Sequence, residues 1–308
     1  MRSNNVFQRY FSLRFRHLLS GASDGNPPWL PAVASGDDAG MFLPTDAPWV
    51  VHRDFGTLIG GIRALLMQAL HPGPLAGVAQ HSRYESDPLG RLSGTIRWLT
   101  VTTFGSTTAV ADEAKRVNRL HDRVSGTFID ASDVRRDYRA SDPKLLLWVH
   151  IAFMESFLVA HEKYVGTPIP AGDLSSGADN YIHQWARSVK PLGLNKAPHS
   201  REEMNRIIDE FRESGEARVT EATRQIIEFI RNPPLPRAAI PIYRVLFDAA
   251  VISLRPDFRE MLNLRTPADW WVSAKARFIL KTLRSAVGPE SPIEEAALSR
   301  LQRLGVLP

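Results

Sequence analysis

One stretch near the middle of the chain, residues 144–160, limits what this protein can fold into. It follows Ser141-Asp-Pro143, a pattern that starts helices because proline fits the first helical turn. Apolar residues such as Leu146, Val149 and Phe157 cover more than half of the circumference of the expected helix. A helix that is apolar nearly all round is buried on all sides. The sequence therefore predicts a central helix that other helices surround.

Apolar residues recur at helical spacing through most of the chain, and no stretch shows the strict alternation that is typical of strands. We predict an all-α fold, with one large multi-helix domain over residues 49–308 and an N-terminal extension and connector over residues 1–48. The helices are expected at residues 54–71, 74–81, 90–104, 108–124, 144–160, 178–189, 201–230 (with a break near Gly215), 240–254, 257–263, 268–286 and 292–304, with a weaker helix at residues 1–20.

Two adjacent glycines, Gly60 and Gly61, lie inside one of these expected helices. Each glycine destabilises a helix interior by about 1 kcal/mol relative to alanine. A helix that keeps two of them is expected to be approached closely along its backbone. The sequence leaves open whether another helix or a flat ligand makes that approach.

The chain contains no cysteine. This excludes disulfides, thiolate-held haem, cysteine zinc sites and cysteine nucleophiles, so any metal must be held by His, Asp, Glu or Tyr. The lack of disulfides suits a reducing compartment, and we expect a cytoplasmic protein. The formal net charge is only +5 and charges of both signs are interspersed, so no nucleic-acid partner is expected.

The N-terminal segment is basic and aromatic, but it has no uninterrupted apolar stretch, so we do not expect a secretory signal. No run of 18 or more apolar residues occurs in the chain, so no transmembrane span is expected. Residues 1–20 are expected either to pack on the domain or to form a short amphipathic helix that contacts a membrane surface peripherally.

Four of the nine histidines lie in informative places: His71, His81, His121 and His150. His121 and His150 fall on apolar faces of expected helices, where a histidine is either a core residue with satisfied ring nitrogens or a ligand. Haem iron in a chain without cysteine is usually held by histidine. The chain has no His-Glu-x-x-His or Glu-x-x-His motif, so zinc-protease and di-iron-bundle sites are not expected.

Arg91 and Thr95 are four residues apart at the start of an expected helix, so both project from one face. An arginine that enters a helix from an Asp-Pro-Leu-Gly turn is either a surface or capping residue or an inward-facing positive charge. In the second case it could hold a propionate or an oxygen species, and Thr95 could donate a hydrogen bond to the same species.

Several short stretches resemble one family in their order and spacing. They are Gly60-Gly-Ile-Arg63-Ala-Leu-Leu-Met-Gln-Ala-Leu-His71-Pro72, His81-Ser-Arg83, Asp87-Pro-Leu-Gly-Arg91, Val117-Asn-Arg-Leu-His121 and Leu147-Trp-Val-His150. Together they resemble the catalytic domain of the rubber oxygenases (latex-clearing proteins), a family that also contains the fungal oxygenase of mycophenolic acid biosynthesis. The resemblance spans roughly residues 49–285.

The resemblance implies a globin-like helical core around a pocket that holds haem b. In rubber oxygenases the proximal iron ligand is a histidine in a His-x-x-Val segment, which His121-Asp-Arg-Val124 matches. Arg91 and Thr95 match the arginine and threonine of the family's distal Arg-x-x-Lys-Thr motif. This implies iron between His121 on one side and Arg91 with Thr95 on the other.

Two positions depart from the family pattern. Gly94 stands where the family's distal lysine is expected, and Ser125 stands where an arginine follows the valine. With Gly94 in place of a distal ligand, the sixth coordination site of the iron would be open to dioxygen or peroxide from the outset.

The resemblance also suggests roles for residues outside these two motifs. Arg63 is expected to contact the cofactor, and His150 is the competing axial ligand. Trp98, Phe153 and Phe157 are expected to line the substrate space.

The primary hypothesis is a haem-dependent oxygenase or peroxygenase-like enzyme that acts on a small apolar substrate, such as a lipid, terpenoid or unsaturated hydrocarbon. The alternative is a non-catalytic helical protein that binds lipids or small molecules, in which the polar residues are structural. A third hypothesis is a non-haem iron site formed by His71, His81 or His121 with Glu85.

Overall fold

The structure is a computed structural model that describes residues 26–81, 88–130, 132–265, 267–288 and 291–308. Helices account for 65% of it, and the described part of the chain has only one two-stranded sheet. The predicted all-α fold is therefore confirmed. The weak helix expected at residues 1–20 lies outside the described residues.

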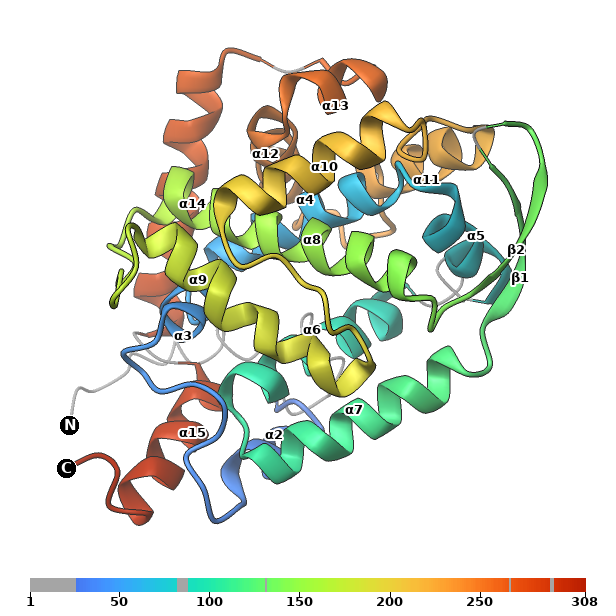
Figure 1. Cartoon of the computed structure of the whole chain (residues 1–308). Coiled ribbons are helices and arrows are strands. Elements are labelled where there is room, and N and C mark those ends of the chain that lie inside the picture. Colours follow the sequence, from blue (N-terminus) through green and yellow to red (C-terminus); the bar gives the residue numbers. More distant parts are fainter. Residues whose placement is uncertain (1–25, 82–87, 131, 266, 289–290) are drawn as a thin grey trace.

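Two helices form the centre of the molecule, α4 (Gly56–Gln68) and α8 (Pro143–Ala160), and they run side by side (Figure 1). α8 begins where the Asp142 side chain accepts a hydrogen bond from the backbone N–H of Lys144. Its side chains are buried round most of the circumference, which confirms the predicted central helix.

The two central helices approach most closely at Gly60. A Cβ at this position would lie 2.7 Å from Cδ1 of Phe157 and 3.1 Å from the carbonyl oxygen of Ser156. Any residue larger than glycine would therefore push the two helices apart. One of the two glycines in α4 serves helix–helix packing.

The main hydrophobic core is completed by helices that follow α8 in the chain. They are α9 (Gly177–Trp185) with the 3-10 segment η2 (Ala186–Leu192), α10 (Arg201–Glu213), α11 (Glu221–Arg231), α12 (Ile240–Ser253), α13 (Pro256–Met261) and α14 (Asp269–Val287). α9 and α10 pack on α8, α12 packs on α4, and α14 packs on α12. The break expected near Gly215 is confirmed between α10 and α11.

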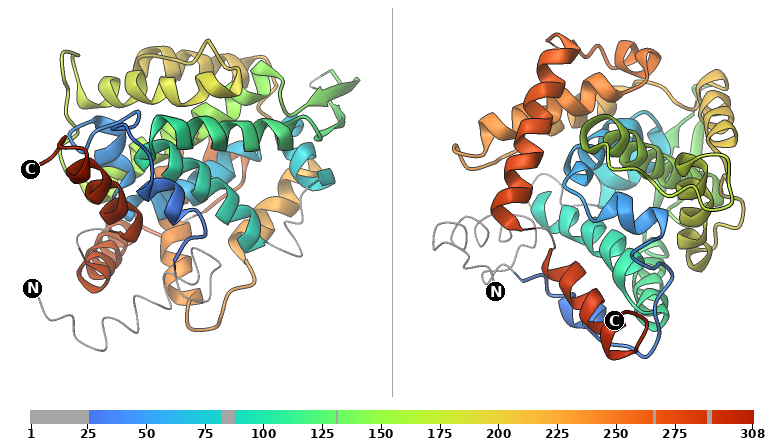
Figure 2. Two further views of the ribbon diagram at one scale, coloured as in Figure 1. Left: turned by 90° about the horizontal axis from the view of Figure 1, so that it is seen from below. Right: turned by 90° about the vertical axis from the view of Figure 1, so that its left-hand side faces the viewer.

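A second hydrophobic cluster joins segments from both ends of the described chain. Its main elements are α2 (Leu30–Ala34), α3 (Ala47–His52), α6 (Pro88–Phe104) and α15 (Pro292–Arg303), with α7 (Thr107–His121) at its edge. α2 and α15 lie side by side (Figure 2). Buried Arg300 donates a hydrogen bond to the carbonyl oxygen of Val33. The segment expected to be a connector therefore contains a short helix and contributes to a core.

A β-hairpin that the sequence did not predict follows α7. It consists of β1 (Ser125–Ile129) and β2 (Arg135–Arg139), which pair antiparallel and pack against α5 (Pro72–His81). β2 has the sequence Arg-Arg-Asp-Tyr-Arg, and Tyr138 is its only buried side chain. Such a strand has no alternating apolar pattern for a sequence analysis to detect.

The hairpin shortens α7 relative to the prediction. The helix was expected to continue to Val124, but it ends at His121 and the chain enters β1 at Ser125. His121 is therefore the last residue of a helix, and its expected mid-helix position is wrong.

α8 continues into a π-helical turn, η1 (His161–Val165), and the chain leaves it at Gly166 with a φ of 73°. Together they form the one segment, among the residues described, that is long and apolar enough to cross a membrane. However, 67% of the apolar 18-residue stretch in this segment is buried inside the protein. The core helix of a globular protein can be equally long and apolar.

Candidate functional site

His150 lies in the middle of α8 and is 5% exposed. Its Nε2 atom is buried and has no hydrogen-bond partner among the residues that the structure describes. Burial lowers the pKa of the imidazole to about 3, so the ring is neutral at physiological pH. Leaving a buried polar atom unsatisfied costs about 1–3 kcal/mol, which makes this atom a candidate ligand for a bound group.

His121 ends α7 on the same face as the buried Val110 and Ala114. Its side chain is half-buried, and its Nδ1 atom is buried without a hydrogen-bond partner. Burial lowers the pKa of the imidazole, and the neighbouring Asp122 acts in the opposite direction. His121 therefore resembles His150 in having a neutral ring with an unsatisfied nitrogen.

His52 of α3 shows what a structural core histidine looks like in this protein. Its Nδ1 lies 2.8 Å from the hydroxyl oxygen of Thr103, and its Nε2 lies 2.8 Å from the hydroxyl oxygen of Tyr181. Both ring nitrogens are satisfied by the protein, in contrast to His121 and His150.

His71 and His161 are intermediate cases. Nδ1 of His71 accepts a hydrogen bond from the backbone N–H of Gly73 (3.1 Å), while its Nε2 lies 3.7 Å from the Glu216 carboxylate. Nε2 of His161 lies 2.8 Å from the carbonyl oxygen of Thr167, and its Nδ1 has no partner. In both His71 and His161, one ring nitrogen is therefore already hydrogen-bonded to the protein.

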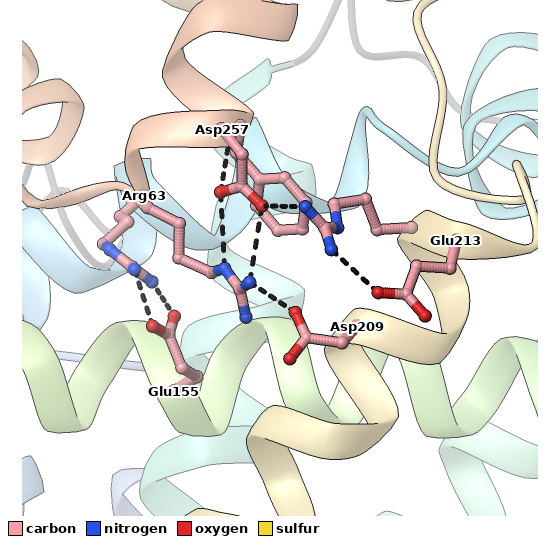
Figure 3. A network of polar contacts seen from close by, with 8 residues as sticks. Arg63, Glu155, Asp209, Glu213 and Asp257 are labelled. Atoms are coloured by element: carbon pink, nitrogen blue, oxygen red, sulfur yellow. Dashed lines mark hydrogen bonds and ion pairs between the residues drawn. The ribbon is translucent and has the colours of Figure 1, made fainter.

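Arg63 of α4 is 1% exposed and forms a bidentate ion pair with Glu155 of α8 (Figure 3). It also donates hydrogen bonds to the hydroxyl oxygen of Ser156 (2.9 Å) and to the carbonyl oxygen of Ser253 (3.1 Å). These contacts engage all three guanidinium nitrogens and join α4 to α8 and α12. These contacts give Arg63 a structural role, so the proposed haem site does not include this residue.

A second ion-pair network lies close to this pair, between α10 and the start of α13 (Figure 3). Arg255 bonds Asp209 and Asp257, and Arg212 lies 3.4 Å from Asp257 and 2.9 Å from Glu213. All five side chains are partly exposed. We assign this network to holding the two helices together.

α6 carries the expected distal residues. Arg91, Gly94 and Thr95 all lie on this helix, as predicted, although the side chain of Arg91 is outside the described part of the structure. Thr95 is half-buried, and a Cβ at Gly94 would meet no atom of the described residues within 4 Å. The surface of α6 is therefore open at the position of the family's lysine.

The sequence analysis missed a second threonine on this face of α6. Thr102 lies seven residues after Thr95, which places both on one side of the helix. Its side chain is fully buried, and its hydroxyl oxygen has no hydrogen-bond partner. The seven-residue spacing was the available signal.

The face of α4 around Gly61 is also open. Within the described part of the chain, no atom lies within 4 Å of a Cβ built on Gly61, although a Cβ on the preceding glycine would clash with α8. Leu58 and Leu65 lie on the same face, half-buried at the edge of the main core. On α8, half-buried Phe153 stacks on Phe157 with ring centroids 5.7 Å apart. Half-buried apolar side chains beside an open backbone suit an apolar ligand.

A comparison with family models decides the relationship. Residues 49–287 match the model of the catalytic domain of ER-bound oxygenase mpaB/B′ and rubber oxygenase. The chain belongs to this family. Comparisons with curated proteins and with solved structures gave no match.

The family match extends from Trp49, near the start of α3, to the end of α14, so it includes every candidate residue described above. It confirms the resemblance inferred from the short sequence stretches and supports oxygenase activity in general. α2 and α15, which form much of the second hydrophobic cluster, lie outside the matched region.

The non-haem iron hypothesis requires three or more ligands in one place. Within the residues that the structure places, no three His, Asp or Glu side chains are grouped so as to hold a metal ion. Glu85 and the side chain of His81 lie outside those residues, so their expected part in such a site stays a prediction.

Proposed function

We propose that this chain is a haem-dependent oxygenase that uses dioxygen or peroxide on a small apolar substrate. One observation carries the proposal: the imidazoles of His121 and His150 each keep a buried ring nitrogen that has no partner among the described residues. They do so in a cysteine-free member of an oxygenase family. Neutral imidazole is the ligand type that holds haem b in such chains.

His121 is the proposed axial ligand, and His150 is its competitor. His121 lies in the His-x-x-Val segment and at the C-terminus of α7, where the helix dipole favours positive charge and so strengthens an imidazole as an electron donor. His150 offers Nε2 from a more deeply buried position. The two assignments predict opposite outcomes for substitution at each position.

Two glycine positions support a flat macrocycle as the bound group. The open positions at Gly61 and Gly94 are on α4 and α6, and the side chains beside Gly61 are apolar and half-buried. When bound, haem would supply the redox chemistry that oxygen activation requires. Thr95 would donate a hydrogen bond on the distal side, and Arg91, one helical turn before it, would supply a fixed positive charge there.

The substrate class follows from the side chains expected beside the cofactor. Trp98 of α6 and Phe153 of α8 are half-buried, and Phe153 stacks on the third expected residue, Phe157. Such side chains exclude water and gain free energy when an apolar molecule covers them. A lipid, a terpenoid or an unsaturated hydrocarbon meets this requirement.

The proposal is tested by the absorption spectrum of protein expressed with a haem precursor. We expect a Soret band and an equimolar amount of haem in the wild type, and loss of the band in His121→Ala. His183→Ala, at an exposed histidine of α9, is the control and should keep the band. A colourless protein that binds hydrophobic probes, with a thermal stability that does not respond to added haem, would instead support the non-catalytic lipid-binding alternative.

A further inference from the structure

The outer face of α14 presents large aromatic side chains to solvent. Trp270 is 72% exposed, Phe278 is 70% exposed and Trp271 is 48% exposed. Residues 270, 274 and 278 are spaced four apart, so they form one stripe along the helix. Exposed aromatic stripes of this size are uncommon on soluble monomers and mark interaction surfaces.

Basic side chains border the aromatic stripe. Nζ of Lys275 lies 4.4 Å from the centroid of the Trp271 ring, and Lys281 is exposed one turn beyond Phe278. Neither lysine forms an ion pair with any residue that the structure places. The one acidic residue of α14, Asp269, is paired with Lys163 at 2.6 Å. The stripe is therefore bordered by net positive charge.

The neighbouring elements do not reverse this charge. Asp248 of α12 interacts electrostatically with Lys275 and offsets at most one positive charge, and Arg231 interacts with the same carboxylate. Arg277, at the opposite border of the stripe, donates hydrogen bonds to a backbone carbonyl of η1 and keeps its positive charge. We call Trp270, Trp271, Phe278, Lys275 and Lys281 the α14 face.

The opposite side of α14 packs against the rest of the protein. Val272, Ala276, Leu280 and Leu283 are buried, and the helix packs on α12 and η1. Figure 2 shows α14 running along one side of the molecule. The aromatic side chains of the α14 face are therefore not required by the core.

We propose that the α14 face docks on an anionic membrane surface. Tryptophan is enriched at membrane interfaces, phenylalanine inserts below the headgroups, and lysine is attracted to anionic lipids. Charge selects this partner, because two copies of a basic face repel each other. The N-terminal segment, residues 1–20, is also basic, so the basic α14 face would repel it as well. Docking would bring the enzyme to the phase in which apolar molecules concentrate, but it does not depend on haem.

Vesicle sedimentation with the full-length chain tests the proposal. The probes are vesicles of phosphatidylcholine with phosphatidylserine and vesicles of phosphatidylcholine alone. We expect binding to the first, weakening as salt is raised, and much weaker binding to the second. Lys275→Gln with Lys281→Gln should weaken binding roughly fivefold per charge removed. Trp270→Ser with Phe278→Ser should weaken it at least tenfold.

Control variants remove one exposed apolar side chain and one exposed lysine elsewhere. Val134→Ser removes an exposed apolar side chain from the hairpin, which lies on the other side of the molecule from α14 (Figure 1). Lys115→Gln removes an exposed lysine of α7. Both should bind vesicles like the wild type, and all variants should keep the wild-type thermal unfolding temperature because the altered side chains are exposed.

Four results would overturn the proposal. In the first, the wild type does not bind the anionic vesicles. In the second, both α14 variants bind these vesicles as strongly as the wild type does. In the third, only a full-length Phe11→Ser/Phe15→Ser variant loses binding. The fourth is a lipid-free dimer that Trp270→Ser with Phe278→Ser converts to a monomer in sedimentation velocity, which would make the face a protein interface.

Discussion

Arg63 of α4 and Glu155 of α8 form a buried ion pair that ties the two central helices together. Serine oxygens satisfy the rest of the guanidinium, so the charge is fully hydrogen-bonded inside the core. The pair lies one turn along α4 from the glycine at which the helices approach most closely. Polar and steric contacts therefore fix the alignment of the same two helices.

Removing one partner of this pair should be strongly destabilising. We expect Glu155→Ala to lower the free energy of unfolding by about 3–5 kcal/mol, because a buried guanidinium is left without its counter-charge. The double variant Arg63→Met/Glu155→Leu should recover much of the loss. Urea unfolding measures both. Equal stability of Glu155→Ala and the wild type would mean that the pair does not hold the helices.

Gly60 and Gly61 should respond in opposite directions to the same substitution. Gly60→Ala places a methyl group 2.7 Å from Phe157 and should cost about 1–3 kcal/mol through overpacking. Gly61→Ala meets no atom and should stabilise the cofactor-free protein by about 0.5–1 kcal/mol through helix propensity. Thermal unfolding of the two variants compares them directly. A similar loss in both would contradict the open space at Gly61.

Gly94→Lys restores the residue type that the family pattern expects in α6. Because a Cβ at this position meets no atom, the variant should fold as well as Gly94→Ala, which serves as its control. In haem-loaded protein we expect the lysine variant alone to show the absorption spectrum of iron with both axial positions filled. Identical spectra of the two variants would place Gly94 away from the distal side.

The buried histidines should make the cofactor-free protein sensitive to acid. Burial lowers the pKa values of His52 and His150 from 6.5 to about 3, so below pH 6.5 the unfolded chain binds protons that the folded chain does not. Stability should then fall as pH decreases, by about 1.4 kcal/mol per pH unit for each histidine. In urea unfolding between pH 6 and pH 4, the free energy of unfolding of His150→Gln should therefore fall less steeply with pH, by about 1.4 kcal/mol per pH unit. An unchanged slope would mean that His150 is solvated.

The sequence predicted the helices well where they carry their own signal. α8 is apolar nearly all round, and the segment of α10 and α11 contains its own glycine break, so both could be recognised without tertiary information. The hairpin could not, because β2 buries only Tyr138 and its pairing with β1 is a tertiary contact. The short helices α2 and α3 are held by α15 and α6, which are distant in sequence.

The candidate site was predictable in its residue types and less so in its partners. His150 stood out as a polar residue on an apolar face, and it proved to be buried with an unsatisfied nitrogen. The partner of Arg63 could not be found, because Glu155 lies 92 positions away in the chain. Thr102 was missed because its seven-residue spacing from Thr95 does not by itself distinguish a site residue from an ordinary threonine of a buried helix.

The central claim is that His121 holds haem iron, and chemical rescue tests it most directly. His121→Gly should lose the Soret band of the wild type and regain it when imidazole is added, because the free ligand occupies the position of the missing side chain. His150→Gly, treated in the same way, should keep its band before and after imidazole. A His121→Gly protein with the wild-type spectrum, or rescue confined to His150→Gly, would contradict the assignment.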